Sequence, residues 1–305
     1  MKKYFIVLFV VNIGCYKEVQ VDIPKQQTVP VVSSLFQPDS VIALTLSTTQ
    51  PIFEDNDTEI TDALVRLYQS DDIVDTLHFK NGSFISDLRP ANGEAYKLKI
   101  DIPGFKTLLA SDKMPEAPNL ISASFKDSVY TDSEGEFMSQ ATITISDIPN
   151  RTNYYELRLK QIYRDSATVG FATEIYDSAA MPVIYDFESN DIVIQNEGQL
   201  GFWSFTNPVF SDKLFNGKVY TMKINYKSLW LLSGSNNSDL IIILRSVSKD
   251  YYTYKKSLTA HIESQWSDVW DGVVEPSAMF TNIENGYGIF AGYSQVTDTI
   301  YKENQ

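Results

Sequence analysis

Apolar and polar residues alternate along most of this chain, and that pattern constrains the fold more than any other feature. Successive side chains of a β-strand point to opposite faces of a sheet, so the alternation predicts strands that bury one face. Between residues 29 and 113 it predicts seven short strands: 29–36, 41–46, 63–68, 75–79, 83–86, 95–100 and 108–111. Turn-separated strands at this density are typical of an immunoglobulin-like β-sandwich, which we place at residues 27–113.

A second set of strands follows a proline-containing segment at residues 113–119 that is typical of a linker. Alternation predicts strands at 139–145, 153–159, 219–226, 240–247 and 288–293. The first two, with the polar turn between them, resemble strands B and C of a fibronectin type III domain. We therefore expect an all-β protein of two tandem β-sandwiches, the second spanning residues 114–305.

Two stretches of this second domain depart from the alternation. Residues 165–215 are irregular, and we interpret them as an insertion made of long loops or a hairpin. In contrast, residues 249–265 carry Tyr251, Tyr254, Leu258 and Ile262 at spacings of three and four. This spacing predicts one helix near the C-terminus, with an apolar face that packs on the second sandwich.

The N-terminus has the pattern of an export signal. Lys2 and Lys3 precede eight apolar residues, a run too short to span a membrane but long enough for the core of a signal peptide. The next residues, Asn-Ile-Gly-Cys, resemble a bacterial lipobox that ends in Cys15. We predict a lipoprotein signal peptide at residues 1–14, a tether at 15–26 and lipidation of Cys15; an ordinary cysteine in the leader is the alternative.

The solitary cysteine and the net charge limit how the fold can be stabilised and which partners the protein can bind. Because Cys15 is the only cysteine, the body can form no internal disulfide and must be held by its core. The formal net charge is −14, and loss of Lys2 and Lys3 would take it to −16. Nucleic-acid binding needs clustered Lys and Arg, so it is not expected. Lys17 and Glu18, just behind Cys15, look like the export signal of surface lipoproteins in Bacteroidota. From this resemblance we expect a lipid-anchored protein of the outer membrane that is exposed at the cell surface, with a periplasmic orientation as the alternative.

Few residues indicate catalysis. His78 and His261 have no second histidine at a ligand spacing, and neither a nucleophile elbow nor a phosphate-binding glycine loop occurs. We therefore expect no enzymatic activity, no cofactor and no metal. A hydrolase with an unrecognised pair of carboxylates is the alternative, but 39 acidic residues give no basis for choosing a pair.

Two further groups of residues are candidate binding sites, one for calcium and one for a ligand or protein partner. Asp55, Asp57 and Glu59 alternate as in a calcium loop, but the glycine and the distal glutamate of such a loop are missing, so a solvated connection is the competing interpretation. Trp203, Trp266 and Trp270 lie in irregular segments, where exposed aromatic residues could contact a ligand or partner. They could equally form a lid over the core of the second domain.

Several blocks resemble a known family. They are residues 31–40, 81–84, the run YYTYKKSL at 251–258, and the run TNIENGYGIFAGY at 281–293. Together they look like an uncharacterised family of Bacteroidota outer-membrane lipoproteins with a domain of unknown function, often encoded beside TonB-dependent receptors. The resemblance implies a binding or accessory subunit of a TonB-dependent transport system, with an outer-membrane barrel protein as partner and an unknown ligand. A structural subunit of an envelope assembly complex is the alternative.

Overall fold

Strands dominate the computed structural model, which confirms the all-β prediction. The structure describes residues 27–50, 58–135, 137–169, 172–177, 183–184, 187–189, 191–197, 207–227, 238–265 and 277–301. The strands are β1 (Pro30–Phe36), β2 (Ala43–Thr48), β3 (Leu64–Gln69), β4 (Asp72–Lys80), β5 (Ser83–Ile85), β6 (Ala95–Asp101), β7 (Leu108–Lys113), β8 (Asn119–Thr131), β9 (Phe137–Ser146), β10 (Tyr154–Val169), β11 (Ala172–Asp177), β12 (Val183–Ile184), β13 (Phe187–Glu188), β14 (Val209–Ser211), β15 (Val219–Lys227), β16 (Ser238–Val247) and β17 (Tyr287–Ile300). The described helices are α1 (Ile192–Glu197) and α2 (Lys249–Gln265).

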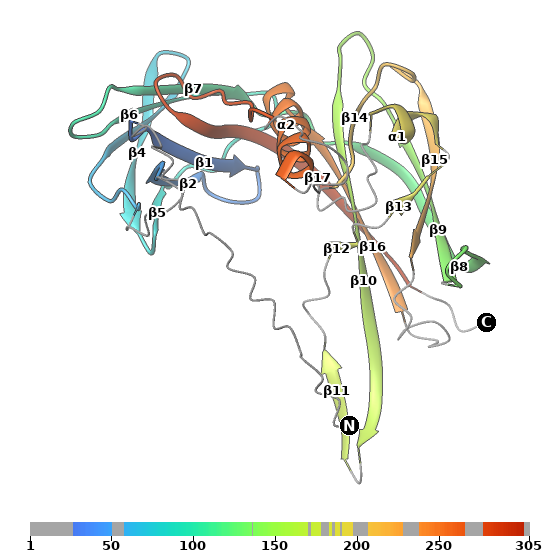
Figure 1. Ribbon diagram of the computed structural model, residues 1–305. Coiled ribbons are helices and arrows are strands. Elements are labelled where there is room, and N and C mark those ends of the chain that lie inside the picture. Colours follow the sequence, from blue (N-terminus) through green and yellow to red (C-terminus); the bar gives the residue numbers. More distant parts are fainter. Residues whose placement is uncertain are drawn as a thin grey trace, which may run out of the picture.

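The strands form one large and one small sheet. The large sheet has the order β11-β10-β16-β17-β1-β2-β5-β4-β3-β6-β7, with β12 and β14 also paired to β10. The small sheet has the order β13-β15-β9-β8. In Figure 1 the strands β1 to β7 lie at one side of the molecule and the small sheet at the other, with α2 between them.

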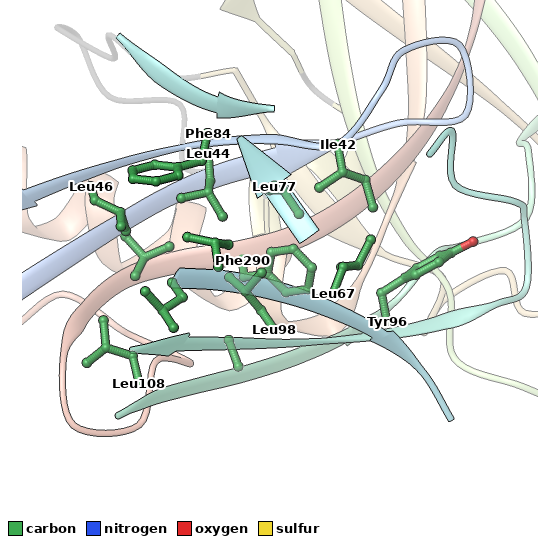
Figure 2. Close-up of a cluster of buried hydrophobic side chains, with 14 of the residues drawn as sticks. Ile42, Leu44, Leu46, Leu67, Leu77, Phe84, Tyr96, Leu98, Leu108 and Phe290 are labelled. Carbon is green, nitrogen blue, oxygen red and sulfur yellow. The ribbon is translucent and has the colours of Figure 1, made fainter. Parts of the chain in front are cut away.

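The first hydrophobic core lies inside the half of the large sheet that contains β1 to β7. Alternate residues of these strands point inward, as the sequence pattern predicts, and Figure 2 shows their side chains packed together. The sheet curls so that β7 returns to the segment before β17, where Leu109 and Glu284 form an isolated bridge, with Glu284 N 2.8 Å from Leu109 O. The curled sheet therefore encloses one core.

The second hydrophobic core lies between the small sheet and the other half of the large sheet. Its buried side chains come from β9 and β15 on one side and from β10 and β16 on the other, with Val193 and Ile194 of α1 closing one part. Two facing sheets with inward-pointing apolar residues are the arrangement of a β-sandwich.

The last strand, β17, joins the two halves, which its sequence does not reveal. It pairs in parallel with β1 and antiparallel with β16, and it extends to Ile300 rather than ending at 293 as the alternation predicts. Phe290 belongs to the first core, whereas Val296 and Ile300 pack against the second. The division at 113/114, and the finer assignment to immunoglobulin-like and fibronectin-like sandwiches, stay predictions.

Close backbone approach fixes the start of β17. Gly288 has a φ of +103°, and a Cβ atom built there would lie 1.9 Å from the carbonyl oxygen of Val32 on β1. Only glycine avoids both the strained backbone and this overlap. Gly288 is therefore a requirement of the parallel pairing between β1 and β17.

Helix α2 begins and ends where the sequence pattern predicts. Ser248 caps it, because its Oγ accepts a hydrogen bond from Tyr251 N at 3.1 Å. Tyr251 packs with Val247, Ile289 and Ala291 in a small cluster of buried residues, so the helix covers β16 and β17 near the junction of the two halves.

The predicted insertion at 165–215 contains regular structure. Residues 164–169 of β10 pair with β11 as a hairpin, which extends away from the rest of the molecule in Figure 1. The short helix α1 was not predicted from the sequence. Its first turn is capped by Asp191, whose Oδ1 accepts a hydrogen bond from Val193 N at 2.9 Å.

Candidate functional site

A cleft of about 270 Å³ opens where the two halves of the protein meet. The end of β7 and the segment after it form one wall, and the β9–β10 turn, the end of β16 and the start of α2 form the other. Pockets at such junctions are common binding sites because two separate groups of side chains converge there. Its lining residues are Gly93, Asp112, Lys113, Met114, Pro115, Glu116, Arg151, Thr152, Asn153, Tyr154, Ser246, Val247, Ser248 and Lys249.

Asp112 is the titratable group most perturbed by this location. Burial raises the pKa of its carboxyl from 3.8 to about 6, and the negative charge of Asp250 acts in the same direction. Hydrogen bonds from Ser248, Gly292 N and Lys113 N oppose the shift, and the Gly292 bond to Oδ2 is 2.8 Å long. Asp112 on β7 is thereby bonded to Gly292 of β17 and to Ser248, the residue before α2, so it links the two halves.

The opposite wall rests on a buried polar cluster beneath the β9–β10 turn. Arg151 Nε donates to Asn153 Oδ1 at 2.9 Å, and Asn153 Nδ2 donates to Asp147 and Asp212 at 3.1 and 3.0 Å. Tyr155 donates its hydroxyl to Asp147 at 2.5 Å. Burial raises the pKa of Asp212, and the neighbouring Asp147 adds to the effect. The cluster holds the turn, and with it Arg151, in place.

Charged side chains line both walls of the cleft. Asp112, Lys113 and Glu116 come from the first wall, and Arg151 and Lys249 come from the second. Among the described residues, the carboxylate of Glu116, the Nη atoms of Arg151 and the ammonium of Lys249 form no hydrogen bond or ion pair. These groups are therefore available to a ligand.

A second charged cluster lies beneath α2 and serves packing. Glu156 is 1% exposed; its Oε2 accepts hydrogen bonds from Arg245 Nη1 and from the Tyr251 hydroxyl, each at 2.9 Å. Lys255 Nζ lies 3.6 Å from Oε1, and the Arg245 guanidinium lies 4.1 Å from the centre of the Tyr293 ring. None of these residues lines the cleft, so the cluster fastens α2 to β10 and β16.

A larger groove of about 470 Å³ runs over the outer face of β3, β6 and β7. Tyr68, Lys97, Lys99 and Leu109 are among its lining residues, and Glu284 borders it. The ion pair between Lys97 and Asp71, 3.1 Å apart, is largely exposed, and exposed ion pairs contribute little to stability. The junction cleft is the stronger candidate although it is smaller, because it combines a partly buried titratable group with a raised pKa, Asp112, with charged groups from both walls.

Of the residues singled out from the sequence, the three that the structure describes do not line this cleft. Cys15, Asp55, Asp57, Trp203, Trp266 and Trp270 lie outside the described residues. Glu59 is exposed and forms an isolated bridge with Ser47. His78 is exposed on β4, and His261 on α2 places Nδ1 2.7 Å from the carbonyl oxygen of Ser277.

In the described parts of the chain there is neither a cluster of metal-ligating side chains nor a membrane-spanning helix. No group of three or more His, Cys, Asp or Glu side chains is placed there to hold a metal ion. None of the helices described has the length and apolar character needed to cross a membrane.

The cleft residues were missed because no motif marks them. Asp112 occupies an alternating polar position near the end of a strand, and Arg151 follows a turn, so both resemble ordinary surface residues in the sequence. The proline-containing segment at 113–119 was the nearest indication, since it placed a junction there.

The fold and the cleft define a class: an all-β protein with two hydrophobic cores joined by its last strand and a small-molecule-sized cavity between them. The chain belongs to the family described as domain of unknown function (DUF4249), whose model matches residues 16–299. No curated protein matches the chain.

Proposed function

We propose that this protein is a lipid-anchored surface lipoprotein of the outer membrane in Bacteroidota. It acts there as a non-enzymatic binding or accessory subunit of a TonB-dependent transport system. The pattern of Lys2, Lys3, the apolar run and Cys15 supports lipid attachment. The family match over residues 16–299 supports the resemblance on which the transporter association depends.

The junction cleft is the observation that carries the binding role. Available charged groups from two walls surround a cavity of about 270 Å³, and one wall contains a carboxyl whose pKa is raised to about 6. Perturbed titratable groups in clefts are frequent at functional sites. A subunit that captures a small ligand and passes it to a transporter needs a site of this kind.

The test is co-purification of the full chain from outer membranes in a mild detergent. A tag at the C-terminus leaves the predicted lipid site intact. We expect a TonB-dependent receptor to be recovered with the wild-type chain and to be lost with Cys15→Ser, which cannot take the thioether-linked lipid.

Two results would contradict the proposal. Recovery of the chain from the outer membrane without any barrel protein removes the transporter association. Recovery of a stable complex of other envelope proteins instead favours a structural subunit of an assembly complex.

A further inference from the structure

We propose that the junction cleft binds a small zwitterion, namely a free amino acid or a short peptide with both termini free. The ammonium group lies toward Asp112 and Glu116, and the carboxylate lies toward Arg151 and Lys249. This proposal rests on the proposed binding function and names its ligand class.

The distribution of charge between the two walls is the first reason. The first wall contributes the carboxylates of Asp112 and Glu116, and the second contributes the cations of Arg151 and Lys249. A ligand with separated charges of both signs can match both walls at once, whereas a simple anion or cation would meet like charge on one side. Lys113 also belongs to the first wall, which therefore carries two carboxylates and one cation, whereas the second wall carries cations alone.

The availability of these groups is the second reason. Arg151 uses Nε to bond Asn153, and this bond orients the guanidinium and leaves both Nη atoms for a ligand carboxylate. A guanidinium can bind a carboxylate through two parallel hydrogen bonds. Glu116 lies near the 92–93 turn, since a Cβ built on Gly93 would be 2.8 Å from its Oε1. The carboxylate that would receive the ammonium therefore lies beside the turn that contains Gly93, another residue of the cleft lining.

Size is the third reason. The cleft volume of about 270 Å³ lies just below the range of about 300–1,000 Å³ that drug-sized ligands occupy. A single amino acid or a dipeptide fits a space of that order. Longer peptides would have to leave the cleft with one terminus, which would lose one of the two charged contacts.

Titration of Asp112 gives the proposal a pH signature. Charged groups around it are Asp250, Lys113, Glu116, Arg151 and Lys249. A bound ammonium favours the ionised form of Asp112, so affinity should rise as pH rises through about 6. If only the ionised form binds, the competent fraction is about one tenth at pH 5, and the Kd there should be about tenfold higher than at pH 7.5.

The experiment is isothermal titration calorimetry of the purified full chain in detergent, with L-alanyl-L-alanine as the probe. N-acetyl-alanyl-alanine and alanyl-alanine amide each lack one terminal charge. We expect each to bind at least tenfold more weakly than the free dipeptide. Tetra-alanine tests the size limit and should also bind more weakly.

Matched variants assign each terminus to its wall. Glu116→Gln should weaken binding of the free dipeptide and remove the difference in affinity between it and the acetylated form. Arg151→Gln should remove the difference between the free and amidated forms. Lys97→Gln, in the outer groove, is the control and should change neither difference.

Binding of the blocked peptides with the same affinity as the free dipeptide would overturn the proposal. So would the absence of binding at millimolar dipeptide, or an unchanged discrimination in both cleft variants. Co-purification with a receptor does not depend on this result. A chain that recovers the receptor but does not bind the dipeptide refutes the ligand class and leaves the proposed function standing.

Discussion

Replacing Asp112 by asparagine should change how the stability of the protein depends on pH. The aspartate has a pKa of 3.8 in its ordinary setting and of about 6 in the folded protein, where burial is the main cause of the increase. The folded state therefore binds a proton more tightly than the unfolded state does. The resulting stabilisation is fully present below pH 3.8 and is lost as pH rises through about 6.

The magnitude follows from the size of the shift. Each pKa unit corresponds to about 1.4 kcal/mol, so the change from 3.8 to about 6 corresponds to about 3 kcal/mol of unfolding free energy. Asp112→Asn has no proton to gain or lose. Its amide oxygen can still accept the hydrogen bond from Gly292 N. Part of this difference is already lost at pH 4, where the unfolded aspartate is more than half ionised. Relative to wild type, the variant should thus gain between about 2 and 3 kcal/mol of unfolding free energy from pH 4 to pH 7.5.

Urea unfolding followed by circular dichroism at pH 4, 5, 6 and 7.5 measures this difference. Comparing the two proteins at each pH removes the contribution of the other acidic residues, which are common to both. Carbon-13 NMR titration of the Asp112 carboxyl measures its pKa directly. The reasoning would be refuted if the difference in unfolding free energy between the two proteins stayed constant over this pH range. It would also be refuted if the wild type became more stable relative to the variant as the pH rose to 7.5.

Three further predictions follow from individual contacts. Glu156→Ala should lower the unfolding free energy by about 3–5 kcal/mol, because Arg245 would be left buried without its partner. Lys255→Ala should lower it far less, since Lys255 Nζ lies 3.6 Å from the Glu156 carboxylate. Urea unfolding of the two variants measures the difference. Gly288→Ala should prevent folding, because its Cβ would overlap the Val32 carbonyl. In Gly104→Ala the new Cβ meets no atom within 4 Å, so this variant should lose only about 1–3 kcal/mol of stability through backbone strain. Soluble yield and thermal unfolding distinguish the two variants. Cys15→Ser should move the protein from the membrane pellet to the soluble fraction, and an unchanged distribution after fractionation would argue against lipidation.

The sequence was sufficient to locate most strands and the long helix. Period-two alternation marks residues that face a core whichever strand lies beside them, so β1 to β7 could be placed without knowing their partners. The spacing of Tyr251, Tyr254, Leu258 and Ile262 likewise defined α2. In β17, residues after 293 are mostly polar, which hid the extension to Ile300 along β16.

Strand pairing could not be predicted in the same way. The parallel pairing of β1 with β17 joins residues more than 250 positions apart, and alternation carries no information about which strands are neighbours. The cleft depends on that pairing, since Gly292 on β17 donates to Asp112 on β7. Because the site is made by this topology, its residues have no shared motif in the sequence.

The position of β17 also bears on how the cleft could work. The strand contributes Phe290 to the first core and packs Val296 and Ile300 against the second, and between these residues it holds Asp112 through Gly292. Asp112 is bonded as well to Ser248, which caps α2. A charge placed in the cleft therefore acts directly on the hydrogen bonds that join the two halves. Ligand binding and the strength of the junction should be coupled, and by linkage the coupling is the same in both directions.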